Sequence, residues 1–255
     1  MTDSGEPSAN KQEPSAHKQE PSIQNPEPAA TVILLRNTPA GLEVLLLLRA
    51  KAVKFAGGAW VFPGGRIDDD DTDAGVTASS LDKGDDAFNR AARRAALREC
   101  LEETGIQLDA DNLVTYSHWT TPATQYNRRF STRFLLAELT ENQPVTVDDG
   151  EIVEFRWLTP AQALTEHDNG ELVVLPPTYR TLTELNRCQS ADEAITMAKQ
   201  REMPDISPLM VKHDGTVTTL YKEDISYTTG DLSLQGPQHR MTRQGKRWIY
   251  VDTTN

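Results

Sequence analysis

The sequence predicts an α/β fold in which helices pack against a mixed sheet. Two apolar runs, 31–36 and 42–48, flank a turn that contains Pro39 and Gly41, a pattern typical of neighbouring strands. A run rich in Ala, Arg, Leu and Glu extends from 87 to 104 and favours a long helix, because these residues have high helix propensity. Strands and helices then alternate along the chain, which is typical of the α/β class.

Further elements follow from local patterns. Strands are predicted, where β-branched and aromatic residues cluster, at 60–62, 114–119, 129–139 and 152–158. Short helices are predicted, where a proline or an N-cap residue precedes a helical pattern, at Pro160, Pro176 and after Ser190. Asp214-Gly215 and Gln244-Gly245 are typical turn pairs, so the C-terminal part should contain two β-hairpins.

Changes in composition predict the domain organisation. Residues 1–29 repeat the pattern Glu-Pro-Ser-Ala-x-Lys-Gln, and a proline in each repeat opposes a helix, so we expect a disordered tail. The main domain is expected over 30–202, with an acidic insertion at 66–86. A β-rich extension over 203–255 is expected to pack on this domain.

The net charge and the cysteine content limit which ligands and which cellular compartment are expected. The chain has 26 Lys and Arg against 38 Asp and Glu, a net charge of −12. Because nucleic acids and anionic membranes are bound through basic surfaces, neither is expected, whereas a small anionic substrate held through a metal is compatible. No apolar run is long enough to span a bilayer, and Cys100 and Cys188 are too few for a disulfide framework. We therefore expect a cytoplasmic protein, of undetermined oligomeric state.

The long helix carries a candidate metal site. Glu99, Glu102 and Glu103 stand at i, i+3 and i+4, so their side chains share one helix face roughly 5–6 Å apart. Arg98 lies four residues before Glu102 and can pair with it from the side. Gly105 is placed to end the helix in the left-handed conformation, which keeps the three acids close to the helix end.

Helix geometry alone leaves two interpretations of this acidic face. On a solvated helix, repulsion between like charges costs only some tenths of a kcal/mol, so the face can be an ordinary exposed surface. If the face is partly buried, each pair of like charges costs roughly 3 kcal/mol, and a cation is then required. Carboxylate oxygens with no nearby His or Cys ligand pattern favour Mg²⁺ or Mn²⁺ over Zn²⁺.

The same stretch resembles a known family. Residues 98–106, RECLEETGI, are similar to the second half of the Nudix signature, in which Arg-Glu, an aliphatic-type residue, any residue, Glu-Glu, any residue, Gly and an aliphatic residue follow a Gly-led loop. The resemblance implies a Nudix α/β/α sandwich with a mixed sheet, extended by C-terminal helices and β-hairpins. It also implies that Glu99, Glu102 and Glu103 bind Mg²⁺ or Mn²⁺ and, with Arg98, form the catalytic centre.

The first half of the signature is altered. Gly64 and Gly65, which the resemblance makes structural residues of the motif with Gly105, follow a short predicted strand. The stretch between Gly65 and Arg98 is about 19 residues longer than in the family, and Asp71 stands where the family has a glutamate six residues after the glycine. The contribution of this loop to the site is therefore open, whereas the helical glutamates are complete.

Runs outside the signature narrow the resemblance to the nucleoside diphosphate-linked moiety X motif 19 branch, which resembles coenzyme A diphosphatases. They cover about Thr31 to Arg201 and include 45–49, 61–65, 118–122, 129–134 and 175–178. The resemblance implies hydrolysis of a diphosphate bond in a nucleoside diphosphate linked to another moiety. Coenzyme A or an acyl-coenzyme A is the leading candidate, with 3′,5′-ADP and a phosphopantetheine as products.

Several further residues receive expected roles. The resemblance implies substrate binding by Arg49, Arg128 and Arg129; the latter two either clamp a phosphate or pair with the acidic insertion. Glu151 is either an extra ligand or general base, or an ordinary exposed strand residue. Three aromatic residues either stack on a base or belong to the core, namely Trp119, Phe130 and Phe134. Four basic residues either meet a 3′-phosphate or face solvent, namely Arg240, Arg243, Lys246 and Arg247.

Two alternatives to the coenzyme A substrate stay open. The first is an ADP-sugar or dinucleotide pyrophosphatase, to which Pro122, sixteen residues after Ile106, is a pointer. The second is a non-catalytic nucleotide-binding Nudix sensor. The complete set of helical glutamates argues against a sensor.

Overall fold

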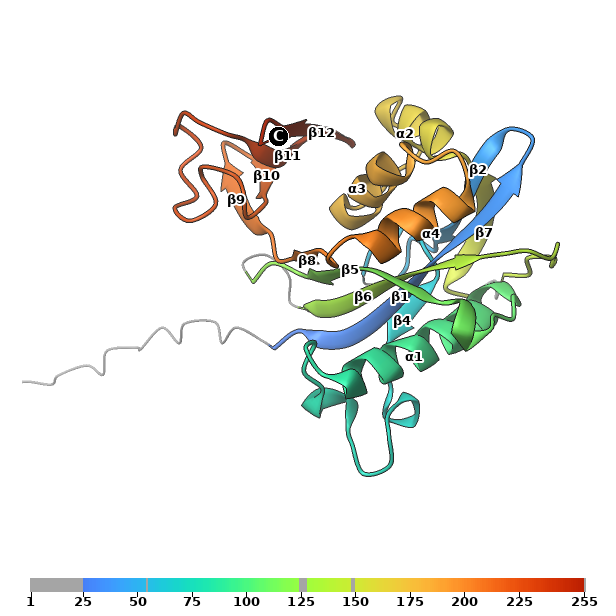
Figure 1. Ribbon diagram of the computed structural model, residues 1–255. Coiled ribbons are helices and arrows are strands. Elements are labelled where there is room, and N and C mark those ends of the chain that lie inside the picture. Colours follow the sequence, from blue (N-terminus) through green and yellow to red (C-terminus); the bar gives the residue numbers. More distant parts are fainter. Residues whose placement is uncertain (1–24, 54, 124–127, 148–149, 255) are drawn as a thin grey trace, which may run out of the picture.

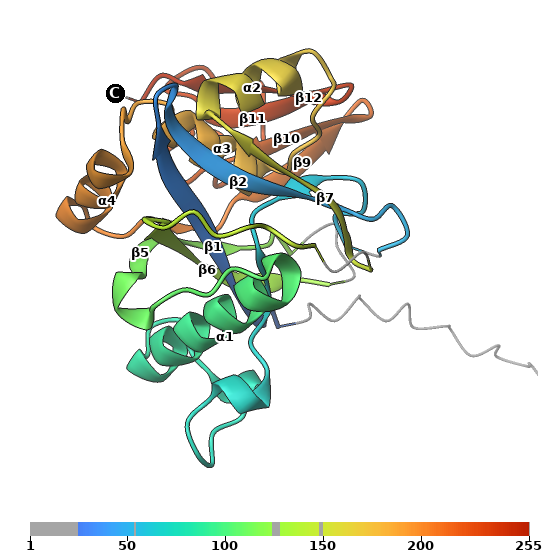
Figure 2. The same ribbon diagram turned by 90° about the vertical axis from the view of Figure 1, so that its right-hand side faces the viewer.

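The structure is a computed structural model that describes residues 25–53, 55–123, 128–147 and 150–254. The N-terminal repeats lie outside the described residues. A mixed sheet forms the centre, and it is covered by helices on both faces (Figure 1). Helix α1 (Asp86–Thr104) lies on one face, and α2 (Pro160–Asp168), α3 (Pro176–Leu185) and α4 (Ala191–Gln200) lie on the other (Figure 2). The predicted α/β class is thereby confirmed.

The strands of this sheet are close to those expected from the sequence. They are β1 (Glu27–Thr38), β2 (Gly41–Arg49), β3 (Trp60–Val61), β4 (Gly64–Arg66), β5 (Val114–Thr120), β6 (Phe130–Glu138), β7 (Ile152–Leu158) and β8 (Asp205–Ile206). Strand β1 begins three residues before the boundary predicted at 30, and the short strands β4 and β8 were not expected. None of the helices in the described part of the chain is long and apolar enough to cross a membrane.

The topology places the glycine pair beside helix α1. The strand order is β3-β2-β1-β6-β5-β8, with β4 paired to β1 and β7 paired to β2. Strand β1 pairs with β4 through 29–31 and with β2 through 35–38, both antiparallel, while β6 runs parallel to it on the other side. Between the two pairings, Val32 N donates to Pro63 O at 2.9 Å. This bond holds Gly64 and Gly65 against the middle of β1.

Alternation along β1 divides the apolar side chains between two cores. Ile33 and Leu35 join the core beneath α3 and α4, whereas Val32 and Leu34 join the core beneath α1. This period of two is what a strand buried on both faces requires. On α1, small buried residues allow the helix to approach the sheet closely, namely Ala91, Ala92, Ala95 and Ala96.

The C-terminal residues form a second, four-stranded antiparallel sheet. Its order is β12 (Arg247–Asp252), β11 (His239–Gln244), β10 (Thr216–Leu220) and β9 (Leu209–His213). Both predicted hairpins are present, and Asp214 and Gly215 have φ of 47° and 78°, the left-handed values that this turn needs. Trp248 Nε1 donates to Val174 O at 2.9 Å, which ties this sheet to the segment before α3. The division of the chain at 202 and 203 stays a prediction.

Ion pairs fasten the acidic insertion to α1. Asp73 pairs with Arg90 and Arg94 at 2.7 and 2.9 Å, and Asp71 pairs with Arg98 at 2.7 Å. Because the three arginines are spaced at i, i+4 and i+8, they lie along one side of the helix. The local excess of acid in 66–86 therefore has a structural counterpart on α1.

A histidine buried between β5, β6 and α1 makes the fold sensitive to acid. His118 is 1% exposed, its Nε2 lies 2.9 Å from Ser131 Oγ, and its ring meets the edge of Phe88. Burial, followed by the nearby charge of Arg133, lowers the pKa of His118 from 6.5 to about 4. The unfolded chain therefore binds a proton at His118 between these two values, and the folded chain does not.

We predict that titration of His118 lowers the free energy of unfolding by about 2 kcal/mol between pH 7 and pH 5, relative to a protein in which this residue does not titrate. The variant His118→Gln should lose this part of the pH dependence, because glutamine does not titrate. Urea unfolding of both proteins at pH 7 and pH 5 measures it. The exposed His213→Gln is the control and should follow the unchanged protein, and an equal slope in all three proteins would contradict the prediction.

Candidate active site

The end of α1 sets the position of the three glutamates. Gly105 adopts a φ of 71°, and its N–H donates to Leu101 O at 2.9 Å, as predicted for the residue that ends this helix. Ile106 returns directly to the core beneath α1. Glu102 is exposed, Glu99 is partly buried and Glu103 is almost fully buried. The acidic face is therefore not an ordinary solvated surface.

Glu103 is the most deeply buried of the three. Its Oε2 accepts a hydrogen bond from Gly64 N at 2.9 Å, and its Oε1 lies 3.8 Å from Arg49 Nη1. Burial raises the pKa of Glu103 to about 8, and the negative charges of Glu99 and Glu151 act in the same direction. The Gly64 hydrogen bond and Arg49 oppose this shift. A carboxylate in such surroundings needs positive charge to stay ionised.

The two glycines are required by close approach. A Cβ on Gly65 would lie 2.2 Å from Glu99 Oε1, and a Cβ on Gly64 would lie 2.4 Å from Ala30 O. A side chain on Gly64 would push the loop away from the backbone of β1, whereas one on Gly65 would displace the Glu99 carboxylate from its present position. The expected structural role of the glycine pair thus has a physical reason, and the insertion does not separate this loop from the helix.

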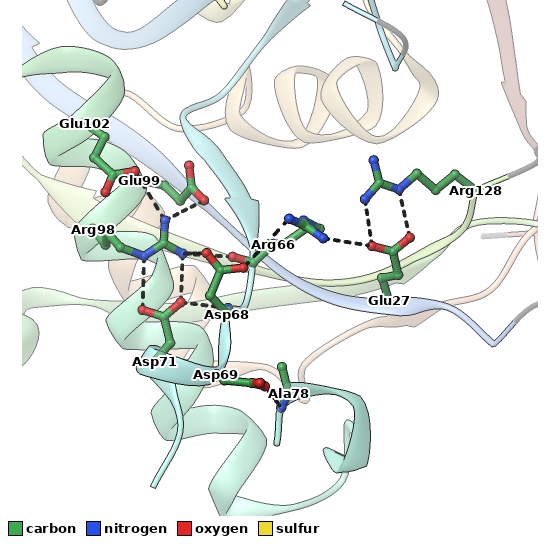
Figure 3. A network of polar contacts seen from close by, with 10 residues as sticks. All are labelled: Glu27, Arg66, Asp68, Asp69, Asp71, Ala78, Arg98, Glu99, Glu102 and Arg128. Atoms are coloured by element: carbon green, nitrogen blue, oxygen red, sulfur yellow. Dashed lines mark hydrogen bonds and ion pairs between the residues drawn. The ribbon is translucent and has the colours of Figure 1, made fainter. Parts of the chain in front are cut away.

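Arg98 connects the acidic insertion to two glutamates (Figure 3). Its Nη1 donates to Glu99 Oε1 at 2.8 Å and to Glu102 Oε2 at 3.3 Å, which is the side pairing expected from the sequence. Its Nε and Nη2 donate to the two oxygens of Asp71 at 3.2 and 2.7 Å. The bond to Asp71 is the largest cause of the raised pKa of Arg98. Burial raises the pKa of Glu99 despite this partner.

Asp71 is the residue whose role the sequence left open. Its side chain is 6% exposed, and it also accepts a hydrogen bond from Asp68 N at 3.0 Å. The sequence pointed to Asp71 through its position six residues after Gly65. The longer stretch between Gly65 and Arg98 made this position hard to interpret. In the fold, Asp71 lies in the first part of the insertion, six residues after Gly65, and its carboxylate reaches Arg98.

Arg128 pairs with Glu27 of β1 through two hydrogen bonds of 2.8 and 2.9 Å, and Arg66 lies 3.7 Å from the same carboxylate (Figure 3). The expectation that Arg128 pairs with the acidic insertion is therefore wrong, because β1 begins early enough to bring Glu27 beside it. Arg129 Nε donates to Thr121 O at 3.0 Å instead. Arg49 Nη2 donates to Glu151 Oε2 at 2.8 Å, at the start of β7.

One cavity of about 790 Å³ collects most of the predicted site residues. Its lining includes Glu99, Glu102, Glu103, Glu151, Arg49, Arg66, Arg128, Gly64 and Gly65. Arg98, Arg129 and Gly105 are not among the lining residues. The cavity thus brings carboxylates and guanidinium groups together from α1, β2, β4, β7 and the residues before β6.

A second, apolar cavity of about 280 Å³ adjoins the first, and both are lined by Thr31, Phe62 and Phe130. The aromatic residues Trp119 and Phe134 line it and are also buried in the core beneath α3 and α4, as the core interpretation predicted. Phe130 is less buried and meets Phe55 edge to face at 5.0 Å between ring centres.

The four basic residues of the C-terminal sheet do not gather at one point. Arg240 is buried and makes two hydrogen bonds of 2.7 Å to Asp224, so the expectation that it faces solvent is wrong. The buried Asp224 requires this partner, since an unpaired charge in the interior is strongly unfavourable. Arg247 donates to Asp168 O and Arg243 to Gly245 O, and no contact of either with the cavities is seen among the described residues.

The donor set fits a hard divalent cation in its chemistry. Three glutamate carboxylates from one helix end line the same cavity, and oxygen ligands of this kind suit such ions. In their present rotamers these carboxylates face Arg98, Gly64 and Arg49, and among the described residues no group of three His, Cys, Asp or Glu side chains converges on one point. Arg49 Nε, buried beside Glu103, has no hydrogen-bond partner in the described part of the chain.

Comparisons with known proteins agree with this site. The model of the NUDIX domain matches residues 25–176. A relative from Caenorhabditis elegans named "Putative nudix hydrolase 7" is 26% identical over 84% of this chain and 78% of its own, and the acyl-coenzyme A diphosphatase NUDT19 of Xenopus laevis is 23% identical over 78% and 75%. The crystal structure of a NUDIX hydrolase from Alicyclobacillus acidocaldarius is 25% identical and superposes with a TM-score of 0.59, over 69% of this chain and 97% of that one.

The matched residues 25–176 contain strands β1 to β7 of the central sheet, the glycine pair and helix α1 with its three glutamates. The match therefore covers the elements that build the polar cavity. Fold, site and family model lead to the same conclusion: the chain belongs to the Nudix family and is a Nudix hydrolase.

Proposed function

We propose that this protein uses Mg²⁺ or Mn²⁺ to hydrolyse the diphosphate bond of a nucleoside diphosphate linked to another moiety, with coenzyme A or an acyl-coenzyme A as the substrate. The observation that carries the proposal is the polar cavity, which is lined by four glutamates and three arginines. The similarity to an acyl-coenzyme A diphosphatase supports the choice of substrate. Water attacks one phosphorus, the bridging P–O bond breaks, and 3′,5′-ADP and a phosphopantetheine leave.

The glutamates at the end of α1 are the proposed metal ligands, namely Glu99, Glu102 and Glu103. A bound divalent cation would neutralise charge on the phosphates and favour a hydroxide over water as the nucleophile. Arg98 is the proposed positioning residue, because it contacts two of the three glutamates and is itself fixed by Asp71.

The arginines of the cavity are the proposed phosphate-binding residues. Arg49 lines the polar cavity, its side chain is 15% exposed, and its Nη2 is held by Glu151, so its guanidinium places positive charge beside the glutamates. Glu151 is 64% exposed in its side chain, and its bond to Arg49 favours a role in orienting this guanidinium. Arg128 stands across the cavity with two donors held by Glu27.

Two alternative functions are distinguished from this proposal by experiment. An ADP-sugar or dinucleotide pyrophosphatase would use the same diphosphate chemistry, and product analysis distinguishes it. A sensor without activity would bind nucleotide in Mg²⁺ and not turn it over. We also propose a reducing compartment such as the cytoplasm, because Cys100 and Cys188 are both free and buried.

Conversion of the ligand glutamates to glutamine should abolish turnover. We expect Glu102→Gln and Glu103→Gln each to lower kcat by at least about 10²-fold, because each removes negative charge from the site that stabilises the cation. Chromatographic product detection in Mg²⁺ and in Mn²⁺ measures this. Glu154→Gln is a matched control, since Glu154 is exposed on β7 and does not line the cavity. Full activity in either ligand variant would remove the proposed metal role.

Asp71→Asn should raise the Mg²⁺ concentration that gives half of maximal activity, by about 10-fold to 100-fold. Its effect passes through Arg98, which then holds Glu99 and Glu102 less firmly, and Asp71→Glu should recover part of the loss. The control is Asp73→Asn, which breaks ion pairs of the same insertion to Arg90 and Arg94 outside the cavity. A loss of thermal stability with unchanged metal dependence would show that Asp71 is structural only.

A substrate panel tests the choice of molecule. The purified protein should release 3′,5′-ADP from coenzyme A and acyl-coenzyme A faster than it releases products from ADP-ribose, NADH or diadenosine polyphosphates. Preferred cleavage of one of the latter would replace the coenzyme A assignment and keep the hydrolase mechanism. Nucleotide binding without turnover of any of them, in folded protein, would favour the sensor.

A further inference from the structure

The apolar cavity is lined by two parts of the chain, one inside and one outside the segment that matches the Nudix family model. Its floor comes from the central sheet, where Phe130, Thr132 and Phe134 alternate on one face of β6. Its opposite wall comes from residues beyond the matched range 25–176, including Met210 of β9 and Thr219 of β10. The C-terminal sheet therefore completes a chamber beside the polar cavity.

The two cavities differ in charge. Glutamates and arginines line the first, whereas no charged residue is among the described residues that line the second. A substrate that bridges both must have an anionic end and an uncharged end. In coenzyme A, the 3′,5′-ADP half carries an additional phosphate and is costly to place in an uncharged chamber. The pantetheine arm carries no charge beyond its own phosphate.

One polar group in the chamber has no partner. Thr219 is 1% exposed, and its hydroxyl makes no hydrogen bond within the described residues. A buried hydroxyl without a partner is unfavourable in a folded protein. Because Thr219 lies in the wall of the chamber, rotation of its side chain would bring the hydroxyl to a ligand that offers an acceptor. An amide or thioester carbonyl on an otherwise uncharged ligand is such an acceptor.

We propose that this chamber binds the uncharged arm of the substrate, with the Thr219 hydroxyl donating to an amide or thioester carbonyl and the terminal acyl group packing against Met210. The inference rests on the proposed function and adds to it: the C-terminal sheet, outside the matched Nudix segment, determines which arm is accepted. The diphosphate lies at the junction, close to the glutamates of α1, and the nucleotide half extends on the side of Arg128.

The test compares the two product halves as separate ligands. Isothermal calorimetry in Mg²⁺ should show that Thr219→Val weakens binding of 4′-phosphopantetheine about threefold to tenfold and leaves binding of 3′,5′-ADP unchanged. Because valine removes an unpaired buried hydroxyl, the thermal midpoint of the variant should not fall. Thr218→Val is the matched control, since the hydroxyl of Thr218 pairs with Thr242 at 3.1 Å and does not line the chamber.

A second variant probes the space of the chamber. Thr120→Trp, at the end of β5 where the side chain is only partly buried, should reduce kcat/KM for long-chain acyl-coenzyme A more than for free coenzyme A, and Val211→Ala on β9 should change neither. Weaker binding of 3′,5′-ADP instead of 4′-phosphopantetheine in Thr219→Val would place the base in the chamber and overturn the proposal. Binding of both ligands unchanged in Thr219→Val would overturn it as well.

These outcomes are separable from failure of the proposed function. If the unchanged protein hydrolyses coenzyme A and the variants bind and select as it does, only the assignment of the chamber is wrong. If the unchanged protein neither hydrolyses coenzyme A nor binds 4′-phosphopantetheine, the substrate proposal itself is wrong, and the variants are not needed to decide it.

Discussion

The contact between the glycine pair and the end of α1 is the constraint on which the rest of this site depends. Gly64 N donates to a carboxylate that is almost fully buried, and Gly65 leaves room for the neighbouring Glu99. This approach requires β4 to pair with β1 and requires α1 to pack closely through its alanines. The position of Glu103, the shape of the polar cavity and the direction of Arg49 all follow from it.

Charge compensation explains how an acidic chain maintains an acidic site. The insertion adds aspartates close to three glutamates, yet its buried or partly buried carboxylates are paired with arginines spaced along α1. Arg98 is shared between Asp71 on one side and Glu99 and Glu102 on the other. The interaction energy of such a network is larger than that of exposed single pairs, because its members hold one another in fixed geometry.

Buried polar groups also fix α3 and the residue after α4 on the main sheet. Glu184 of α3 accepts from Tyr116 at 2.7 Å and from Arg201 at 3.0 Å, and these partners together lower the pKa of Glu184 against the opposing effect of burial. Beside them, Tyr221 meets the ring of Trp119, which lines the apolar cavity. The wall of that cavity is therefore held by specific contacts, which suits a role in selecting a ligand.

Local sequence patterns were enough to predict most secondary-structure elements and the three glutamates of the candidate metal site. Period-two burial, helix propensity and turn pairs act over a few residues, so they predicted the helices, both hairpins and most strands, and the spacing of Glu99, Glu102 and Glu103 placed three carboxylates on one helix face. The short β4 escaped prediction because Gly-Gly-Arg has no strand propensity and forms a strand only through β1.

The ion-pair partner of each charged side chain and the apolar chamber beside the glutamates depend on the tertiary structure. Asp71 meets Arg98 across 27 positions, Arg128 meets Glu27 across 101, and Arg240 turns inward to Asp224. No local pattern encodes these pairs, because they depend on how strands far apart in the chain are aligned. The apolar chamber is of the same kind: its walls come from β6 and from β9 and β10, and they form a cavity only when the second sheet packs on the first.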